Sequence, residues 1–173
     1  MISRDFVDPS KPVIRVLGLA HALLLTGGMS KVILVVDDDP AVLRSYGHLF
    51  QRLGCHVVLV DDSDRVLSDP ESLRGVDVMI LDQRMPKTTG LDLLACLRRR
   101  STGGSAATGA AGGETPGAAN GHPAVILISA YLSEAIRERA ARLGVTEVIE
   151  KPVDTAHLLA CVRAALADSP PCP

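Results

Sequence analysis

Four short runs rich in Val, Ile and Leu constrain the fold of this chain more than any other feature, and they span residues 32–36, 76–81, 124–128 and 145–149. Apolar runs of this length are typical of strands that are buried on both faces, and such strands belong to parallel sheets. The polar residues that follow the runs are Asp37, Asp38 and Asp39, then Asp82, then Ser129, and finally Glu150 with Lys151. Because ligands of an open parallel sheet bind beyond the carboxyl ends of its strands, we expect these side chains to converge at one edge.

Helix signals lie between the apolar runs. Pro40 suits the first turn of a helix, and Ser133 and Asp154 can each cap one. The expected helices cover residues 40–53, 63–67, 91–99, 134–143 and 155–167, and a further strand covers residues 56–60. Five strands that alternate with five helices predict an α/β fold with a doubly wound, five-stranded parallel sheet.

The composition limits the size and the partners of the protein. A chain of 173 residues with 47% hydrophobic content suits one well-buried domain. A formal net charge of -2 gives no global reason to expect a nucleic-acid or membrane partner, and 2% aromatic residues supply little for base stacking. The four cysteines show no CxxC spacing, so we expect reduced thiols in a cytoplasmic protein.

Three segments fall outside the expected alternation. Residues 1–28 form an N-terminal extension whose apolar stretch, residues 16–25, is too short to span a bilayer and lacks a signal-peptide cleavage site, so Met29 is the expected working start. Residues 101–122 are mostly Gly, Ala, Ser and Thr and are expected to be a flexible insert. The expected domain therefore covers residues 29–169, and residues 170–173 form a tail.

The residue types at the strand ends suit phosphoryl chemistry. Clustered carboxylates repel one another unless a cation lies between them, and Mg²⁺ prefers oxygen ligands. A carboxylate beside that ion can act as a nucleophile and form an aspartyl phosphate. The phosphoryl oxygens then need an ammonium group and a hydroxyl donor, which Lys151 and Ser129 can supply.

These motifs resemble those of the receiver domain of bacterial two-component response regulators, which has a flavodoxin-like fold. The resemblance covers roughly residues 30–167 apart from the insert. The motifs that carry it, in the order of the family, are Leu34-Val35-Val36-Asp37-Asp38-Asp39-Pro40, Leu81-Asp82-Gln83-Arg84-Met85-Pro86, Gly90, Ser129-Ala130-Tyr131 and Lys151-Pro152.

The resemblance implies a phosphoacceptor and a metal site. Asp82 matches the residue that takes phosphate from a histidine kinase or a histidine phosphotransfer protein. Asp38 matches a direct Mg²⁺ ligand, Asp37 an acid that acts through a bound water, and the backbone carbonyl of Arg84 a further protein ligand. Asp39 matches no required residue, and we expect it to cap the following helix.

The resemblance also implies a switch, and this chain departs from the family pattern at three positions around it. Ser129 and Lys151 match the hydroxyl and the lysine that sense the attached phosphate. Val148 stands three residues before Lys151, where the family usually has an aromatic residue, so the usual ring rotation is unavailable. Tyr131 and Arg84, two residues after Ser129 and after the phosphoacceptor, are expected to modulate the lifetime of the phosphorylated state.

Two alternative functions are open. Asp37-x-Asp39 mimics the DxD motif of haloacid-dehalogenase-type phosphatases, but Ala41 stands where that family has Thr or Val, and Asp82 would lack a role. A receiver-like interaction module that accepts no phosphate is the second alternative, and the absence of the aromatic residue keeps it open.

The expected output of the domain is either a protein contact or the transfer of its phosphate onward in a relay. The last expected helix ends near residue 167 and leaves a tail too short for a DNA-binding or catalytic domain, which predicts a stand-alone receiver without enzymatic turnover. Its downstream protein would dock on the face built from residues 133–167, with no nucleic-acid or membrane partner.

Overall fold

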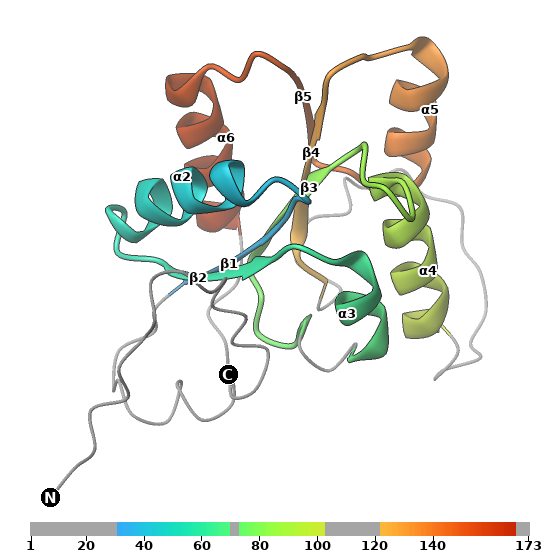
Figure 1. The fold of residues 1–173 in the computed structure, drawn as a ribbon, viewed down its shortest axis with the longest axis horizontal. Coiled ribbons are helices and arrows are strands. Elements are labelled where there is room, and N and C mark those ends of the chain that lie inside the picture. The colour runs from blue at the N-terminus through green and yellow to red at the C-terminus, as the bar shows by residue number, and fades with distance from the viewer. Residues whose placement is uncertain (1–30, 70–72, 103–121, 169–173) are drawn as a thin grey trace, which may run out of the picture.

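The computed structural model describes residues 31–69, 73–102 and 122–168 (Figure 1). The strands are β1 (Val32–Val36), β2 (His56–Val60), β3 (Val78–Asp82), β4 (Ala124–Ser129) and β5 (Glu147–Glu150). The helices are α2 (Pro40–Gln51), α3 (Ser63–Ser68), α4 (Gly90–Thr102), α5 (Glu134–Arg142) and α6 (Thr155–Asp168). The alternation of five strands with five helices in the described part of the chain confirms the predicted fold class. The predictions for residues 1–28, for the tail and for nearly all of the insert lie outside the described residues.

All strands pair in parallel in one sheet of order β2-β1-β3-β4-β5. The chain forms β1 first, places β2 on one side of it and then returns to place β3 on the other side. The carboxyl ends of β1 and β3 are therefore neighbours, because Val36 pairs with Leu81. A doubly wound sheet has its ligand crevice at such a reversal of direction.

Two strands begin later than the sequence predicts. β3 begins at Val78 rather than Val76, since the Val76 N–H donates to the Leu73 carbonyl oxygen in a turn. β5 begins at Glu147 rather than Val145, because the Val145 N–H donates to the carbonyl oxygen of Ala140 at the end of α5. Both valines belong to the connections, so apolar character alone marked the strand starts two residues too early.

Burial separates the central strands from the edges. Every residue of β1, β3 and β4 is buried, as expected for strands covered on both faces. The edge strand β5 has one buried residue, Ile149, so the prediction that the run 145–149 is buried on both faces is wrong. An edge strand has a neighbour on one side only, and its helical cover ends with the sheet.

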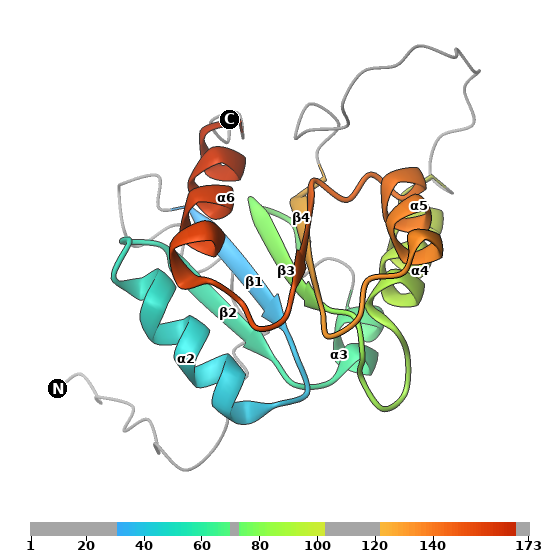
Figure 2. The same cartoon turned by 90° about the horizontal axis from the view of Figure 1, so that it is seen from above.

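The helices lie in two layers, one on each face of the sheet (Figure 2). One layer contains α2 and α6, whose core includes Phe50 and Leu158 together with Ile33 of β1. The other contains α3, α4 and α5, with Leu93 and Ala140 packed in the same core as Leu34 of β1. Alternate residues of one strand thus serve opposite layers.

Local capping fixes where the helices begin. Asp39 caps α2 as predicted, since its side chain accepts a hydrogen bond from the Ala41 N–H at 2.7 Å. Ser133 caps α5 in the same way, and Gly144 follows that helix with a φ of 70°. The helix predicted over residues 91–99 runs from Gly90 to Thr102. No helix in the described ranges has both the length and the apolar character needed to cross a bilayer.

Candidate functional site

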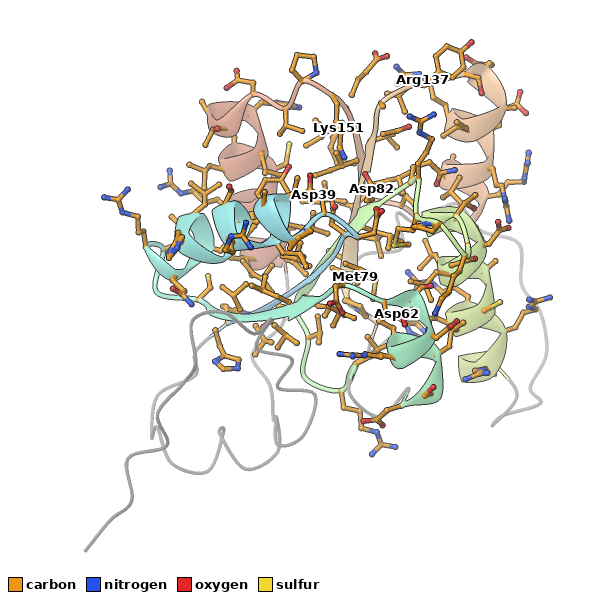
Figure 3. All side chains as sticks on the ribbon, viewed as in Figure 1. Asp39, Asp62, Met79, Asp82, Arg137 and Lys151 are labelled. Carbon is orange, nitrogen blue, oxygen red and sulfur yellow. The ribbon has the colours of Figure 1, made fainter. Side chains whose placement is uncertain are left out.

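Three charged side chains meet at the carboxyl ends of the strands. Asp37 follows β1, Asp82 ends β3, and Lys151 follows β5. The Lys151 Nζ lies 2.7 Å from Asp82 Oδ1 and 3.8 Å from Asp37 Oδ2. Figure 3 shows Asp82 and Lys151 close together at this end of the sheet. The convergence that the sequence predicts is therefore present for these three residues.

The site holds two carboxyl groups away from solvent. Asp37 and Asp82 are 3% and 5% exposed. Burial raises the pKa of Asp37 above its usual value, the hydrogen bond from the Asp39 N–H at 2.8 Å opposes this rise, and the charge of Asp82 adds to it. Two buried carboxylates of this kind are stable only beside a positive charge.

Lys151 supplies that positive charge. Burial alone would lower the pKa of its ammonium group, but the hydrogen bond to Asp82 and the attraction of Asp82 and Asp37 raise the pKa above its usual value. The Lys151 N–H also donates to the Ser129 carbonyl oxygen at 2.8 Å, which fixes the lysine backbone to β4. The ammonium group is thus charged at neutral pH and held against Asp82.

The loop after β3 returns to the point from which it leaves. The Arg84 N–H donates to Asp82 Oδ2 at 2.6 Å, and the Gly90 N–H donates to the Gln83 carbonyl oxygen at 3.1 Å. A Cβ atom on Gly90 would lie 2.4 Å from the backbone oxygen of Asp82, so only glycine permits this approach without a backbone shift. The Arg84 N–H of this closed loop therefore fixes the orientation of the Asp82 carboxylate.

Gln83 is a part of this site that the sequence analysis missed. Its side chain is buried, and its Oε1 accepts a hydrogen bond from the Leu91 N–H, in the first turn of α4, at 3.1 Å. A helix leaves such N–H groups without a partner in its own backbone. An amide side chain directly after Asp82, at the end of a fully buried strand, was the signal that could have identified it, since buried polar groups need partners.

Ser129 and Tyr131 form a local turn at the end of β4. The Ser129 hydroxyl is buried, donates to the Tyr131 carbonyl oxygen at 2.7 Å and accepts from the Tyr131 N–H at 3.2 Å. The Tyr131 side chain is 68% exposed. The hydroxyl is thus present at the predicted strand end, where the backbone of the following loop orients it.

The Asp triplet after β1 divides among three environments. Asp37 points into the buried cluster, and Asp39 caps α2. Asp38 is exposed and lines a neighbouring cavity of about 280 Å³ together with Asp61 and Lys87. Asp39 Oδ1 accepts the capping hydrogen bond from the Ala41 N–H, whereas Asp37 lies beside Lys151, so the two carboxylates of the DxD pattern have different partners.

The described residues contain no group of three or more His, Cys, Asp or Glu side chains placed to hold a metal ion. The donor set nevertheless fits Mg²⁺, because that ion is commonly bound through one or two carboxylates and keeps several waters. Asp37 and Asp82 are the two buried carboxylates, and mutual repulsion contributes to the raised pKa of Asp37. A divalent cation would relieve that repulsion.

Two residues complete the account of the predicted site. Val148 is half-buried in β5, where it pairs with Leu127 of β4 and packs against the core beneath α4 and α5. Arg84 is exposed, and its backbone forms an isolated bridge with Thr89. Of the cysteines in the described ranges, Cys55, Cys96 and Cys161 are free thiols of intermediate burial.

The fold and the sequence are similar to known signalling proteins. The response regulator receiver domain model matches residues 33–112. The chain is 35% identical over 144 residues to the Regulator of RpoS of Escherichia coli, which covers 82% of this chain and 36% of that protein. It is 31% identical over 136 residues to the transcriptional regulatory protein FixJ of Azorhizobium caulinodans, covering 78% of this chain and 54% of that protein. The chain thus spans about half of these curated relatives or less.

Solved structures agree with these relatives. A response regulator receiver domain protein from Clostridium thermocellum superposes with a TM-score of 0.62 at 25% identity, covering 79% of this chain and 94% of that one. A CheY-like receiver domain protein from Methanospirillum hungatei has a TM-score of 0.62 at 21% identity, covering 80% and 94%. The fold is that of the CheY-like receiver domains. Residues 33–112 thus match the receiver domain of the response regulators of two-component signal transduction.

Proposed function

We propose that Asp82 is the phosphoacceptor of this receiver domain and that it takes a phosphoryl group from a histidine kinase or a histidine phosphotransfer protein. The observation that carries the proposal is the buried pairing of Asp82 Oδ1 with Lys151 Nζ at 2.7 Å, with Asp37 beside it. A carboxylate oxygen of Asp82 attacks the phosphorus of the phosphohistidine. The P–O bond forms, the P–N bond breaks, and the imidazole nitrogen keeps the electron pair and takes a proton from solvent.

The proposal includes a magnesium ion at the acidic cluster. Asp37, Asp38, Asp82 and the Arg84 carbonyl oxygen would hold it, with waters completing the shell. When bound, Mg²⁺ neutralises charge that builds up on the transferring phosphoryl oxygens. The residues of the chain hold the Asp82 carboxylate in position, through the Arg84 N–H on one oxygen and Lys151 on the other.

Two residues sense the phosphate in this proposal. Lys151 pairs with the phosphoryl oxygens once Asp82 is esterified, since its ammonium group already lies within hydrogen-bond distance of the carboxylate. The Ser129 hydroxyl leaves the Tyr131 carbonyl oxygen and donates to the phosphoryl group, which shifts the loop that follows β4. Val148 has no ring to couple this shift to β5, and exposed Tyr131 and Arg84 modulate the lifetime of the phosphate.

The proposed output is a protein contact in the cytoplasm. The domain spans residues 29–169, has no enzymatic turnover of its own, and presents residues 133–167 to a downstream protein rather than to nucleic acid or membrane. In support, this stretch contains α5, β5 and α6. Ser129 comes shortly before α5 in the chain and Lys151 lies between β5 and α6, so a movement of either residue can reach the surface that these elements form.

The test is phosphorylation by acetyl phosphate and Mg²⁺, measured by intact mass. We expect one added phosphoryl group on the wild type and none on Asp82→Asn. Asp39→Asn is the matched control, because Asn also caps helices and Asp39 lies outside the reacting cluster. An unlabelled wild type would overturn the proposal and favour an interaction module, as would undiminished labelling of Asp82→Asn. Turnover of a phosphomonoester that survives Asp82→Asn would favour a phosphatase.

A further inference from the structure

A path of side-chain hydrogen bonds and one backbone bridge leads from Asp82 to α5. Its first step is the hydrogen bond from the Arg84 N–H to Asp82 Oδ2 at 2.6 Å. Its second step is the isolated antiparallel bridge between Arg84 and Thr89, which the hydrogen bond from the Gly90 N–H to the Gln83 carbonyl oxygen at 3.1 Å holds closed. A displacement of the Arg84 backbone is therefore expected to move Thr89 with it.

Thr89 is joined to the first turn of α4 in both directions. Its hydroxyl donates to Asp92 Oδ2 at 2.6 Å, and the Asp92 N–H donates back to that hydroxyl at 3.1 Å. One half of this pair matches a capping box, because the hydroxyl of Thr89 accepts from the N–H of the third helical residue; the Asp92 carboxylate accepts from that hydroxyl instead of from a backbone N–H. The hydroxyl of Thr89 thus sets the rotamer of the Asp92 carboxylate.

The second oxygen of that carboxylate crosses to α5. Asp92 Oδ1 accepts a hydrogen bond from a guanidinium nitrogen of Arg139 at 2.6 Å. Thr89 and Arg139 together hold the pKa of Asp92 below its usual value, with Thr89 the larger influence. The carboxylate is thus ionised at neutral pH and shared between the Asp82 loop and α5.

The contact spans a region where α4 and α5 are not closely packed. A cavity of about 600 Å³ lies between them, lined by both members of the pair and by residues such as Ala95 and Leu143. Among the nine residues of α5, all of them described, Ala140 is the one that is buried. Figures 1 and 2 show α5 beside α4 in the same helical layer. A helix with so little buried surface responds readily to a change in a polar contact.

Resting on the proposed phosphorylation of Asp82, we infer that the Asp92–Arg139 ion pair couples the phosphorylation state of Asp82 to the position of α5. In an acyl phosphate one Asp82 oxygen is bonded to phosphorus and the other is a neutral carbonyl oxygen, so the Arg84 N–H faces a weaker acceptor and is drawn toward the charged phosphoryl oxygens. Thr89 moves with Arg84, the Asp92 carboxylate reorients, and Arg139 carries the change into α5. This path does not pass through Ser129 or Val148.

The test compares amide hydrogen exchange of residues 82–92 and 134–142 with and without acetyl phosphate and Mg²⁺, normalised to the labelled fraction from intact mass. A partly exposed ion pair changes an equilibrium by roughly two- to fivefold. We therefore expect phosphorylation to alter exchange in α5 of the wild type by roughly that factor. Asp92→Asn and Arg139→Gln should lose most of this response and keep the response of the loop.

Glu138→Gln is the matched control, because it removes the 3.7 Å pair between Glu138 and Arg142 on the same helix without touching the path. It should retain the wild-type response. A labelled wild type whose α5 does not respond would overturn the coupling alone. The coupling would also be overturned if Arg139→Gln, shown to be phosphorylated by intact mass and folded by circular dichroism, has the same hydrogen-exchange response in α5 as Glu138→Gln. An unlabelled wild type would overturn the proposed function and the coupling together.

Discussion

Replacing Lys151 by Met should destabilise the domain, and the loss should depend on pH. The substitution keeps an unbranched side chain but removes the charge that lies 2.7 Å from Asp82 and 3.8 Å from Asp37. Two carboxylates that are at most 5% exposed then face each other without a cation.

The magnitude follows from the burial of the three groups. Removing one partner of a buried ion pair costs about 3–5 kcal/mol. The Lys151 side chain is 34% exposed, so solvent screens part of the interaction. We expect a decrease in the free energy of unfolding of about 1–3 kcal/mol at pH 7 without divalent cations.

The pH dependence comes chiefly from Asp37. Its folded-state pKa is already raised by burial and by the charge of Asp82, so its ionisation reduces stability as pH rises from its usual pKa through the folded value. Without Lys151 the folded pKa of Asp37 rises further. The variant should therefore lose most stability near neutral pH and recover part of it as the pH falls toward 4, where Asp37 binds a proton in the folded state.

Urea unfolding at pH 7 and pH 5, followed by circular dichroism, measures this difference. Lys87→Met is the control, because Lys87 also pairs with two carboxylates, Asp62 and Asp64, but lies in solvent, and its urea midpoint should barely change. A Lys151→Met variant as stable as the wild type, or one whose loss is no smaller at pH 5 than at pH 7, would refute this account of the site.

Three further outcomes are expected. Asp37→Asn should raise the urea midpoint at pH 7 without metal, because it removes a buried carboxyl group whose pKa is raised by desolvation. The same variant should gain less stability from added Mg²⁺ than the wild type does, and an unchanged midpoint together with an unchanged Mg²⁺ effect would contradict this prediction. Gly90→Ala should lower the free energy of unfolding, measured by thermal unfolding, by about 1–3 kcal/mol, because the new Cβ would lie 2.4 Å from the Asp82 backbone oxygen. Gly47→Ala is the control and should lower it less, because its Cβ meets the flexible end of a leucine side chain at 3.1 Å. Equal losses in the two variants would speak against the close approach at Gly90. Asp39→Ala should cost about 1 kcal/mol through loss of the α2 cap yet still accept phosphate from acetyl phosphate, so an unlabelled Asp39→Ala would place Asp39 in the site instead.

The divided roles of the Asp triplet show where sequence reasoning succeeds. The cap at Asp39 was predictable because it depends on neighbours two residues away, and Pro40 marks the helix start. The burial of Asp37 follows from its place at the end of a fully buried strand. The strand starts at Val78 and Glu147 were not predictable from apolar character, because Val76 and Val145 use their N–H groups in turns that end the preceding segments.

The helices and strands, their alternation and the polar residues after each strand are predictable from the amino-acid sequence, since all of these depend on short-range patterns of apolar and polar residues. Which strand ends are neighbours depends on the packing of the whole domain: the order β2-β1-β3-β4-β5 brings Asp37 beside Asp82, although they are far apart in the chain. The same packing also decided that Gln83 holds the first turn of α4 and that Asp92 meets Arg139 across two helices. Contacts of this kind depend on distances between separately folded elements, and no local pattern of residues encodes those distances.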